Sequence, residues 1–328
     1  MKRQLRIRLE SWPTKRPFRI SRHTWNEFPC LVCEIEDGGI IGRGEGMGVY
    51  YLGESIESMA SQIESVKDDI VAGADRQQLM QLLPPGGARF AVDSALWDLE
   101  AQQSGTSAWQ AAGVRPDPVE TVFTIGLEDE PETMGANALA ASDITLFKVK
   151  LGSDRPVERI AAIRKARPDS RLIVDVNQGW TFDELTEYVA PLKALGVLML
   201  EQPLPRGEDE ALDNFESAIP LCSDESCQHL GELDAAVRRY QMLNIKLDKS
   251  GGLTHALELA SAARERGLSL MVGCMGGTSL SMAPSHVVAQ LCEYVDIDGP
   301  LLAQKDREGG LIYERGMVSL PESRFWGT

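Results

Sequence analysis

The chain has 328 residues, of which 43% are hydrophobic and 25% charged, so it is long enough to bury a large core in one or two domains. Its formal net charge of −16 disfavours nucleic acid and anionic membrane surfaces as partners. No apolar run approaches the roughly 18 residues of a membrane span, and the first residues lack the apolar segment of a signal peptide. We therefore expect a cytoplasmic protein, and the sequence leaves open whether its subunits form a homo-oligomer.

Antiparallel strands are predicted at the start of the chain. Residues 3–10 alternate between polar and apolar side chains, and residues 30–36 are apolar and β-branched. Gly38-Gly39 is typical of a hairpin turn. The polar stretch 14–28 is expected to be a loop between the first two strands.

Helices are expected next, because residues 54–104 carry apolar side chains at helical spacing, most clearly over 88–103. Strands followed by helices predict an α+β capping domain over residues 1–115. Within this domain, Cys30 and Cys33 point to opposite faces of one strand, and no second cysteine pair follows. Buried reduced thiols are therefore favoured over a zinc site.

Strands and helices alternate from about residue 118 onwards. The strands are expected over residues 119–126, 145–151, 171–176, 197–201, 220–223, 242–247, 268–272 and 294–297. The helices are expected over residues 130–142, 156–166, 182–194, 211–218, 230–239, 253–266 and 279–291. This alternation predicts an α/β fold, a closed parallel (β/α)8 barrel of the TIM type over residues 116–310.

An open doubly wound sheet is the alternative to a barrel, but no glycine-rich dinucleotide fingerprint follows any of the strands. Residues 311–328 hold a short strand and an aromatic tail, which we expect to complete the capping domain.

Two lysines mark the end of the second barrel strand. Lys148 and Lys150 lie two residues apart in an apolar run, so both project from the same face of the strand. Burying one ammonium group is costly, and burying two side by side is more so. The pattern therefore predicts anionic groups beside them.

Charged side chains recur at the ends of the other barrel strands, the edge that forms the mouth of such a barrel. Strands three to six and eight end, in order, with Asp175, Glu201, Asp224, Lys246 and the pair Asp296 and Asp298. Taken alone, a strand-end aspartate is more often a helix cap or turn residue, and a K-x-K pair a solvated edge. Neither explanation accounts for three carboxylates on consecutive strands with lysines on both sides, so the set is interpreted as a functional site.

The three carboxylates of Asp175, Glu201 and Asp224 form an all-oxygen ligand set. Mg²⁺ suits such ligands, with Mn²⁺ as a substitute, whereas softer metals find no suitable ligands here. The lysines of the second and sixth strands would face each other across the metal. They would offer one base to each face of a substrate carbon.

These residues resemble those of the enolase superfamily, in the subgroup that includes the muconate-lactonising enzymes. The likeness spans nearly the whole chain, from the helix that contains residues 95–99 (ALWDL) to the strands that carry K-x-K, D-x-N, E-Q-P, D-E-S and K. Within this subgroup, residues 244–254 (NIKLDKSGGLT) and the D-x-D pair are similar to those of the dipeptide epimerases.

The resemblance implies a role for each position. Asp175, Glu201 and Asp224 would hold one Mg²⁺ ion, and Lys150 and Lys246 would be the acid/base pair. The remaining site residues would bind the substrate: Thr124, Lys148 and Cys274 would lie against it, and Asp296 and Asp298 would hold its α-ammonium group.

The implied reaction is epimerisation of a dipeptide at the carbon next to its carboxylate, by proton transfer through an ene-diolate intermediate. Removing that proton places a second negative charge on the carboxylate, which Mg²⁺ and Lys148 would stabilise. One lysine removes the proton and the other returns one to the opposite face, so both epimers are substrates.

Two other functions stay open. An o-succinylbenzoate synthase, an N-acylamino acid racemase or a cycloisomerase would use the same platform, but two carboxylates suit a cationic amine and would repel an anionic or acyl terminus. A non-catalytic metal- or ligand-binding barrel would need the buried lysines to be structural.

The second residue of the dipeptide depends on the loop between the first two strands. Epimerases of Ala-Glu dipeptides, which this chain resembles, carry there an arginine that pairs with the glutamate, and that position falls at Trp25 here. An aromatic ring stacks on apolar or cationic side chains but cannot pair with a carboxylate. Arg22 is near enough in sequence to substitute, and domain-interface packing is the alternative role of Trp25. We expect an L,L-dipeptide epimerase with Ala-Glu as one candidate substrate and a slight preference for an apolar or cationic second residue.

Overall fold

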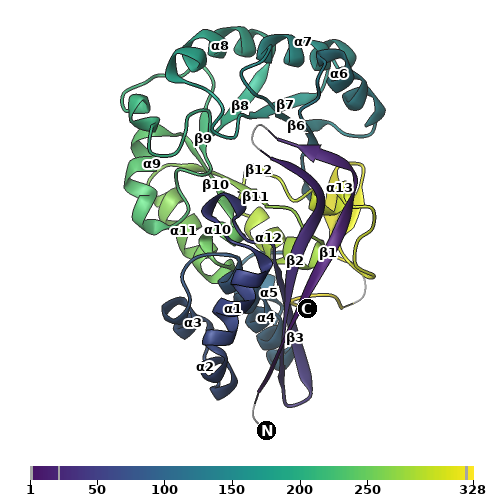
Figure 1. Ribbon diagram of the computed structural model, residues 1–328, viewed down its shortest axis with the longest axis vertical. Coiled ribbons are helices and arrows are strands. Elements are labelled where there is room, and N and C mark those ends of the chain that lie inside the picture. The colour runs from purple at the N-terminus through teal and green to yellow at the C-terminus, as the bar shows by residue number, and fades with distance from the viewer. Residues whose placement is uncertain (1–2, 21–22, 322–323) are drawn as a thin grey trace.

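The computed structural model describes residues 3–20, 23–321 and 324–328. Within them lie a three-stranded antiparallel sheet, an eight-stranded parallel sheet and a second, smaller three-stranded sheet. Figure 1 shows the parallel sheet curled into a barrel, with helices around its outside and the N-terminal domain against one end. None of the described helices combines the length and the hydropathy needed to cross a lipid bilayer.

The N-terminal domain has the predicted α+β architecture. Its strands are β1 (Gln4–Arg19), β2 (Thr24–Asp37) and β3 (Ile40–Gly46), joined in the order β1-β2-β3. The helical part consists of the 3₁₀ turn η1 (Tyr50–Leu52), α1 (Ile56–Ser65), α2 (Lys67–Ala72), α3 (Arg76–Leu82), α4 (Gly87–Ser104) and α5 (Ala108–Ala111). Gly38 and Gly39 form the expected hairpin turn, with φ of 62° and 86°. Cys30 and Cys33 are free, buried thiols that lie in different apolar clusters, as predicted.

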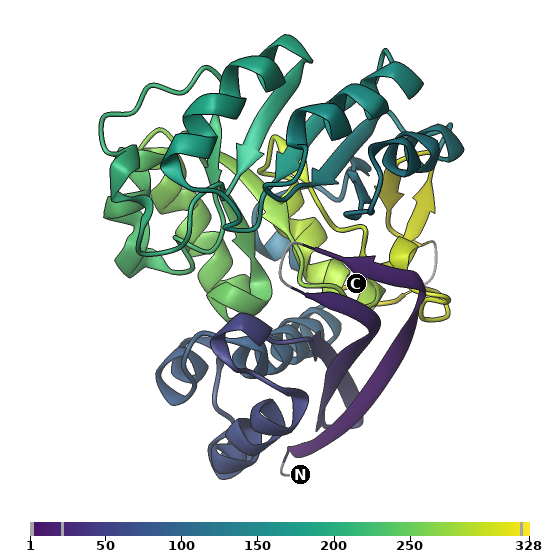
Figure 2. The same cartoon turned by 45° about the horizontal axis from the view of Figure 1, so that its top comes forward.

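The loop predicted over residues 14–28 was wrong, because β1 and β2 continue pairing almost to their ends. The ladder extends to Phe18 opposite Trp25 and Arg19 opposite Thr24, with a register shift between Pro13 and Phe18. Few side chains of this ribbon are buried, so most of them can be polar. The strands pair through their backbones without the polar–apolar alternation by which a half-buried strand is recognised in a sequence. Figures 1 and 2 show the hairpin reaching from the N-terminal domain to the barrel.

Helix α4 lies unusually close to strand β3, because three alternate positions of that strand are glycine. A Cβ atom on Gly42 would lie 2.1 Å from the carbonyl oxygen of Ala95, and one on Gly44 would lie 2.1 Å from that of Ala91. The opposite side of α4 packs against the barrel segment α10 (Leu247–Ser250), so most of the helix is buried. The predicted helix over 88–103 is confirmed.

The barrel strands run in chain order and are parallel, as predicted. They are β5 (Phe123–Ile125), β6 (Leu146–Lys150), β7 (Arg171–Asp175), β8 (Val197–Glu201), β9 (Leu221–Ser223), β10 (Met242–Lys246), β11 (Ser269–Gly273) and β12 (Tyr294–Val295). The ring closes where the backbone N–H of Val122, next to β5, donates to the carbonyl of Val295 at 2.8 Å. The (β/α)8 barrel is therefore confirmed.

Helices surround the barrel at nearly all of the predicted positions. They are α6 (Pro131–Ala140), α7 (Pro156–Ala166), α8 (Phe182–Ala194), α9 (Leu233–Arg239), α11 (Leu253–Glu265), α12 (Ser279–Ala289) and the short α13 (Gly299–Leu302). The helix predicted over 211–218 was wrong: only the 3₁₀ turn η2 (Asp209–Leu212) forms there. Asn214 takes a left-handed φ of 69°, and Asp213 accepts a 2.8 Å bond from Arg239, so the chain turns away from a helix. A second 3₁₀ turn, η3 (Leu230–Glu232), precedes α9.

The strand predicted over 119–126 is divided, and its first part belongs to the third sheet. There β4 (Val119–Glu120) pairs with β14 (Met317–Ser319), which pairs in turn with β13 (Ile312–Glu314). The last residues of the chain return to the N-terminal domain. The Trp326 indole donates to the carbonyl of Ser94 at 3.1 Å, and the Gly327 amide donates to Asp98 at 2.9 Å.

Replacing Gly44 by alanine is expected to destabilise the protein. The new methyl group would overlap the Ala91 carbonyl, so β3 and α4 must move apart. We expect the free energy of unfolding, measured by urea denaturation, to fall by about 1–3 kcal/mol, the usual cost of overpacking. Gly152→Ala is the matched control, because the nearest atom would lie 4.0 Å from its Cβ. Equal stabilities for the two variants would contradict this account of the helix–strand contact.

Candidate active site

The barrel interior is built in layers because side chains alternate along each strand. An apolar floor is formed by Val122, Leu146, Ile173, Met199, Cys222, Met242 and Met271. Two residues further along five of these segments come the buried side chains Lys148, Asp175, Glu201, Asp224 and Asn244. The next inward positions on β6 and β10 are Lys150 and Lys246, which are also buried. The predicted strand-end residues therefore converge above a closed apolar base.

Lys148 lies at the centre of this polar layer. Its Nζ is 2.7 Å from Glu201 Oε2, 2.7 Å from Asp296 Oδ2 and 3.1 Å from Asp175 Oδ2. Burial alone would lower the pKa of Lys148, but the carboxylates of Asp296 and Glu201 raise it well above its ordinary value. Lys150, on the same face of β6, places its Nζ 2.6 Å from Asp175 Oδ2. The anionic groups predicted beside the two lysines are present.

Glu201 is held by one neutral neighbour on β10. Its Oε1 accepts a 2.7 Å hydrogen bond from Asn244 Nδ2. Its Oε2 lies close to Lys148 but accepts no well-aligned hydrogen bond from the described residues, so this oxygen remains able to bind a cation. Burial and the nearby Asp175 carboxylate raise the pKa of Glu201 to about 7.

Asp224 is bonded by two lysines, of which sequence reasoning identified one. Lys246 Nζ donates to its Oδ2 at 2.8 Å, and Lys249 Nζ contacts both its Oδ1 and, at 2.5 Å, its backbone carbonyl. Burial opposes ionisation, but Lys246 and Lys249 lower the pKa of Asp224 below its ordinary value. Lys249 could have been found from its spacing, since the short helix α10 brings a residue three positions after Lys246 back toward β9.

The three carboxylates suit a divalent cation. One oxygen from each of Asp175, Glu201 and Asp224 lies within 4.8 Å of the others, and all three side chains are buried. The polar layer and its rim contain six buried carboxylates and four buried lysines, which leaves two negative charges uncompensated when all are ionised. These groups are Asp175, Glu201, Asp224, Glu225, Asp296 and Asp298, with Lys148, Lys150, Lys246 and Lys249. Hard oxygen ligands with an excess charge of two fit Mg²⁺.

A second group of side chains lies beside the first, across Lys148. Cys274, Asp296 and Asp298 present ligand atoms within 4.8 Å of one another. Thr124, on β5, donates its backbone N–H to Asp298 Oδ2 at 2.7 Å. Burial and the Asp296 carboxylate raise the pKa of Asp298 to about 7. The residues predicted to contact the substrate are therefore brought together, although their roles stay predictions.

Aromatic side chains from the N-terminal domain border the same region. The ring of Trp25 lies 4.1 Å from that of His23 and 5.2 Å from that of Tyr50, between centroids. Burial raises the pKa of Tyr50 to about 12, while Lys246 opposes this shift and Glu225 adds to it. The phenol therefore lies within electrostatic reach of the carboxylate site. Arg22, the alternative to Trp25 in the sequence prediction, lies outside the described residues.

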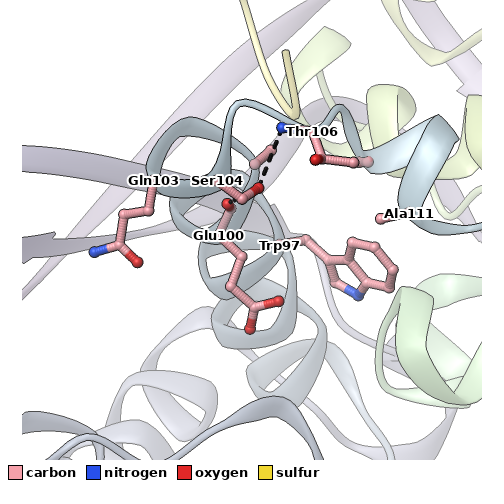
Figure 3. Close-up of a pocket in the computed structure, with 8 residues that line it drawn as sticks. Trp97, Glu100, Gln103, Ser104, Thr106 and Ala111 are labelled. Carbon is pink, nitrogen blue, oxygen red and sulfur yellow. Dashed lines mark hydrogen bonds between the residues drawn. The ribbon is translucent and has the colours of Figure 1, made fainter.

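A separate pocket of about 430 Å³ opens along α4 and α5 (Figure 3). Its lining includes Trp97, Glu100 and Thr106, and the Glu100 carboxylate is already paired with Arg76 at 2.8 Å. Of the ten predicted site residues, all of which the structure describes, none lines this pocket. The predicted site residues converge at the barrel mouth instead.

Family models match most of the chain. The model described as "Mandelate racemase / muconate lactonizing enzyme, N-terminal domain" matches residues 2–113. The model described as "Enolase C-terminal domain-like" matches residues 133–324.

Two curated relatives are similar over nearly their whole length. The N-acetyl-D-glutamate racemase of Pseudoalteromonas sp is 42% identical, over 90% of this chain and 95% of the relative. The L-Ala-D/L-Glu epimerase of Escherichia coli K12 is 41% identical, over 97% of this chain and 100% of the relative.

Solved structures share the architecture. An enolase family member from Agrobacterium tumefaciens, described as homologous to dipeptide epimerases and bound to sodium and L-Ala-L-Glu, matches with a TM-score of 0.96 and 41% identity, over 99% of this chain and 100% of that one. The dipeptide epimerase of Enterococcus faecalis V583, complexed with Mg and L-Leu-L-Tyr, matches with a TM-score of 0.92 and 26% identity, over 100% and 99%.

Changing Glu201 to glutamine is expected to remove metal binding and activity without unfolding the protein. The neutral amide can still accept the Asn244 hydrogen bond and relieves the repulsion among the buried carboxylates. We expect kcat/KM to fall by about 10²–10³-fold or more, and the metal-free variant to melt at the wild-type temperature or above. Calorimetric Mg²⁺ titration and circular dichroism melting measure the two effects. Full wild-type turnover after exhaustive chelation would contradict the metal assignment.

Proposed function

The chain belongs to the mandelate racemase / muconate lactonizing enzyme family of the enolase superfamily, and we propose from this premise that Lys150 and Lys246 epimerise a dipeptide. The protein is a Mg²⁺-dependent isomerase of the dipeptide epimerase type. One observation carries the proposal for the lysines: they approach the ligand cluster from two different strands. Lys150 contacts Asp175 from β6, whereas Lys246 contacts Asp224 from β10.

The two lysines divide the proton transfer between the faces of one carbon. One lysine, in its neutral form, takes the proton from the carbon next to the substrate carboxylate, and the other donates a proton from the opposite side. The configuration at that carbon is inverted. Because either lysine can begin, each epimer is converted into the other.

The residues around the lysines would stabilise the negative charge that develops on the substrate carboxylate. Asp175, Glu201 and Asp224 would hold Mg²⁺, which supplies positive charge beside the substrate carboxylate when that group gains a second negative charge. Lys148 lies against two of these carboxylates and Asp296, and its ammonium group would stabilise the same substrate oxygens. The apolar floor beneath them closes the barrel interior below the polar layer.

Asp296 and Asp298 are proposed to bind the substrate's α-ammonium group. They come from the end of the eighth strand, beside Thr124 and Cys274. Their two carboxylates favour a cation, which a dipeptide with a free amino terminus carries and an N-acetylated amino acid lacks. This contrast supports a dipeptide substrate.

An N-acylamino acid racemase is the second function to be tested, because one relative with 42% identity is an N-acetyl-D-glutamate racemase. The same two lysines would serve that reaction. N-Acetylglutamate and Ala-Glu, assayed at equal concentration, distinguish the two functions through the charge of the amino terminus.

For the second residue of the dipeptide, we propose that Trp25 forms an apolar and aromatic wall. It packs in a cluster with Phe28, Met47 and Met275 as well as against His23 and Tyr50. Such a wall suits an apolar or cationic side chain through packing and cation–π contacts. Ala-Glu remains a substrate to be tested alongside these, because relatives with 41% identity act on it or bind it.

Alanine at Lys150 or at Lys246 is expected to abolish epimerisation, with a loss of about 10³-fold or more, because one face of the carbon then lacks its acid or base. Each variant should still exchange the α-proton of a single epimer with solvent in D₂O, followed by proton NMR. The two variants should differ in which epimer exchanges. Near wild-type epimerisation by either variant would rule out the two-base mechanism.

Trp25→Ala is expected to change the substrate preference without ending catalysis. We expect wild type to have a higher kcat/KM for Ala-X dipeptides with an apolar or cationic second residue, and the variant to lose this preference by about tenfold, the size of one lost aromatic contact. The preference is measured as kcat/KM over a panel of Ala-X dipeptides and N-acetylglutamate, for wild type and variant. A clear preference for Ala-Glu that survives the loss of Trp25 would refute the proposed wall and leave the epimerase assignment intact.

A further inference from the structure

We propose that Gln202 is a positioning residue that sets the separation of two metal ligands, Glu201 and Asp224. Gln202 follows Glu201 directly at the end of β8, and its side chain is completely buried. It carries no charge. The inference rests on the proposed Mg²⁺ site and concerns how that site is held.

Backbone pairing brings the two ligand-bearing strands together but stops short of Asp224. The parallel ladder between β8 and β9 pairs Leu200 with Leu221 and Glu201 with Cys222. Asp224 lies two residues beyond that last pair, where the chain has left the strand. Its distance from Glu201 therefore depends on contacts other than the ladder.

The side chain of Gln202 supplies such a contact. Its Oε1 accepts hydrogen bonds from the backbone N–H groups of Asp224 and Ser226, both at 3.0 Å. Backbone N–H groups can only donate, so the oxygen of the amide must face them. This single oxygen thereby fixes the main chain at Asp224, and with it the base of the Asp224 side chain.

The amide nitrogen is anchored equally firmly on the other side. Nε2 lies 2.8 Å from the Leu204 carbonyl, 2.8 Å from Ser226 Oγ and 3.1 Å from the Tyr240 hydroxyl. The Tyr240 hydroxyl in turn donates to Asp209 at 2.8 Å. The Gln202 amide therefore connects the end of β8, the turn that carries Asp224, and Tyr240 between α9 and β10.

The backbone of Gln202 is itself constrained. Its φ of 36° is in the left-handed region, which costs energy for a residue with a side chain. Its N–H donates to the carbonyl of Cys222 at 2.9 Å. The surrounding contacts thus hold an unfavourable conformation, which directs the side chain across to the Asp224 turn.

A neutral amide suits this task better than a charged group. The carboxylates of Glu201 and Asp224 repel each other, and a cation placed between them would compete with the metal. Gln202 restrains the main chain without changing the charge of the site. Removing it should therefore weaken metal binding through geometry alone.

The test compares Gln202→Met, which keeps the length and the neutrality of the side chain, with Gln228→Met as the control. Gln228 is also a buried amide near this turn, and its side chain donates to the carbonyl of Glu225 at 3.2 Å. We expect the calorimetric Kd of the metal-stripped protein for Mg²⁺ to rise about tenfold or more in Gln202→Met, the usual effect of losing a residue that orients a ligand. Gln228→Met should bind Mg²⁺ as wild type does.

Activity provides a second measurement. At limiting Mg²⁺ the kcat/KM of Gln202→Met should fall, and raising Mg²⁺ to saturation should restore most of it. Should the methionine variant fail to fold, Gln202→Asn is used, because asparagine tolerates a left-handed φ but is too short to bridge to the Asp224 turn. An unchanged Kd for Mg²⁺ in a folded variant would overturn the proposal. If wild type itself binds no Mg²⁺, the proposed metal site fails instead.

Discussion

Mutual compensation of buried charges at the barrel mouth is the constraint on which the rest of the structure depends. Carboxylates this close together repel strongly in a medium of low dielectric constant, and lysines so close do the same. They coexist because each Nζ is within hydrogen-bonding distance of a carboxylate oxygen, as with Lys148 between Glu201 and Asp296. The same arrangement brings Lys150 and Lys246 to the cluster of carboxylates that suits a divalent cation. Because the carboxylates outnumber the lysines, neutralising one carboxylate relieves repulsion, whereas removing one lysine leaves a further carboxylate uncompensated.

Such a site needs a rigid support, and the N-terminal domain provides much of it. Buried Asp248, two residues after Lys246, accepts hydrogen bonds from the backbone of Met47 and Gly48 at 2.8 and 2.9 Å. Asp93 on α4 accepts from the backbone of Thr254 at 3.1 Å. The Asp248 contacts join the end of β10 to the segment that leads into η1 and Tyr50, and the Asp93 contact joins α4 to α11. The capping domain and the barrel thus form one continuous framework around the site.

The sequence predicted those features that depend on periodicity. Alternation of strands with helices identified the barrel, and charged residues at strand ends identified Asp175, Glu201 and Asp224, because every strand of a parallel barrel ends at the same rim. The hairpin over 14–28 was missed, since its backbone pairs without an apolar stripe, and the helix over 211–218 was wrongly expected because Asn214 and the Arg239 contact interrupt it. Lys249 was overlooked although its spacing from Lys246 could have indicated it. No role was predicted for Gln202, because its partners are distant in sequence and a buried amide carries no charge pattern to detect.

The proposed function assigns the reaction and the substrate preference to different parts of this molecule. Lys148, Lys150, Asp175 and Glu201 lie on barrel strands whose registers are set by backbone hydrogen bonds, so a change in the capping domain leaves those registers in place. Trp25, His23 and Tyr50 come instead from the hairpin and η1 of the capping domain, where a side chain can change without disturbing a barrel ladder. If these side chains form the proposed wall, substitutions there would change the contacts to the second residue without removing a charged partner of Lys148. Overall sequence similarity, which is dominated by the barrel and its packing, therefore determines the chemistry more closely than it determines which dipeptide is converted.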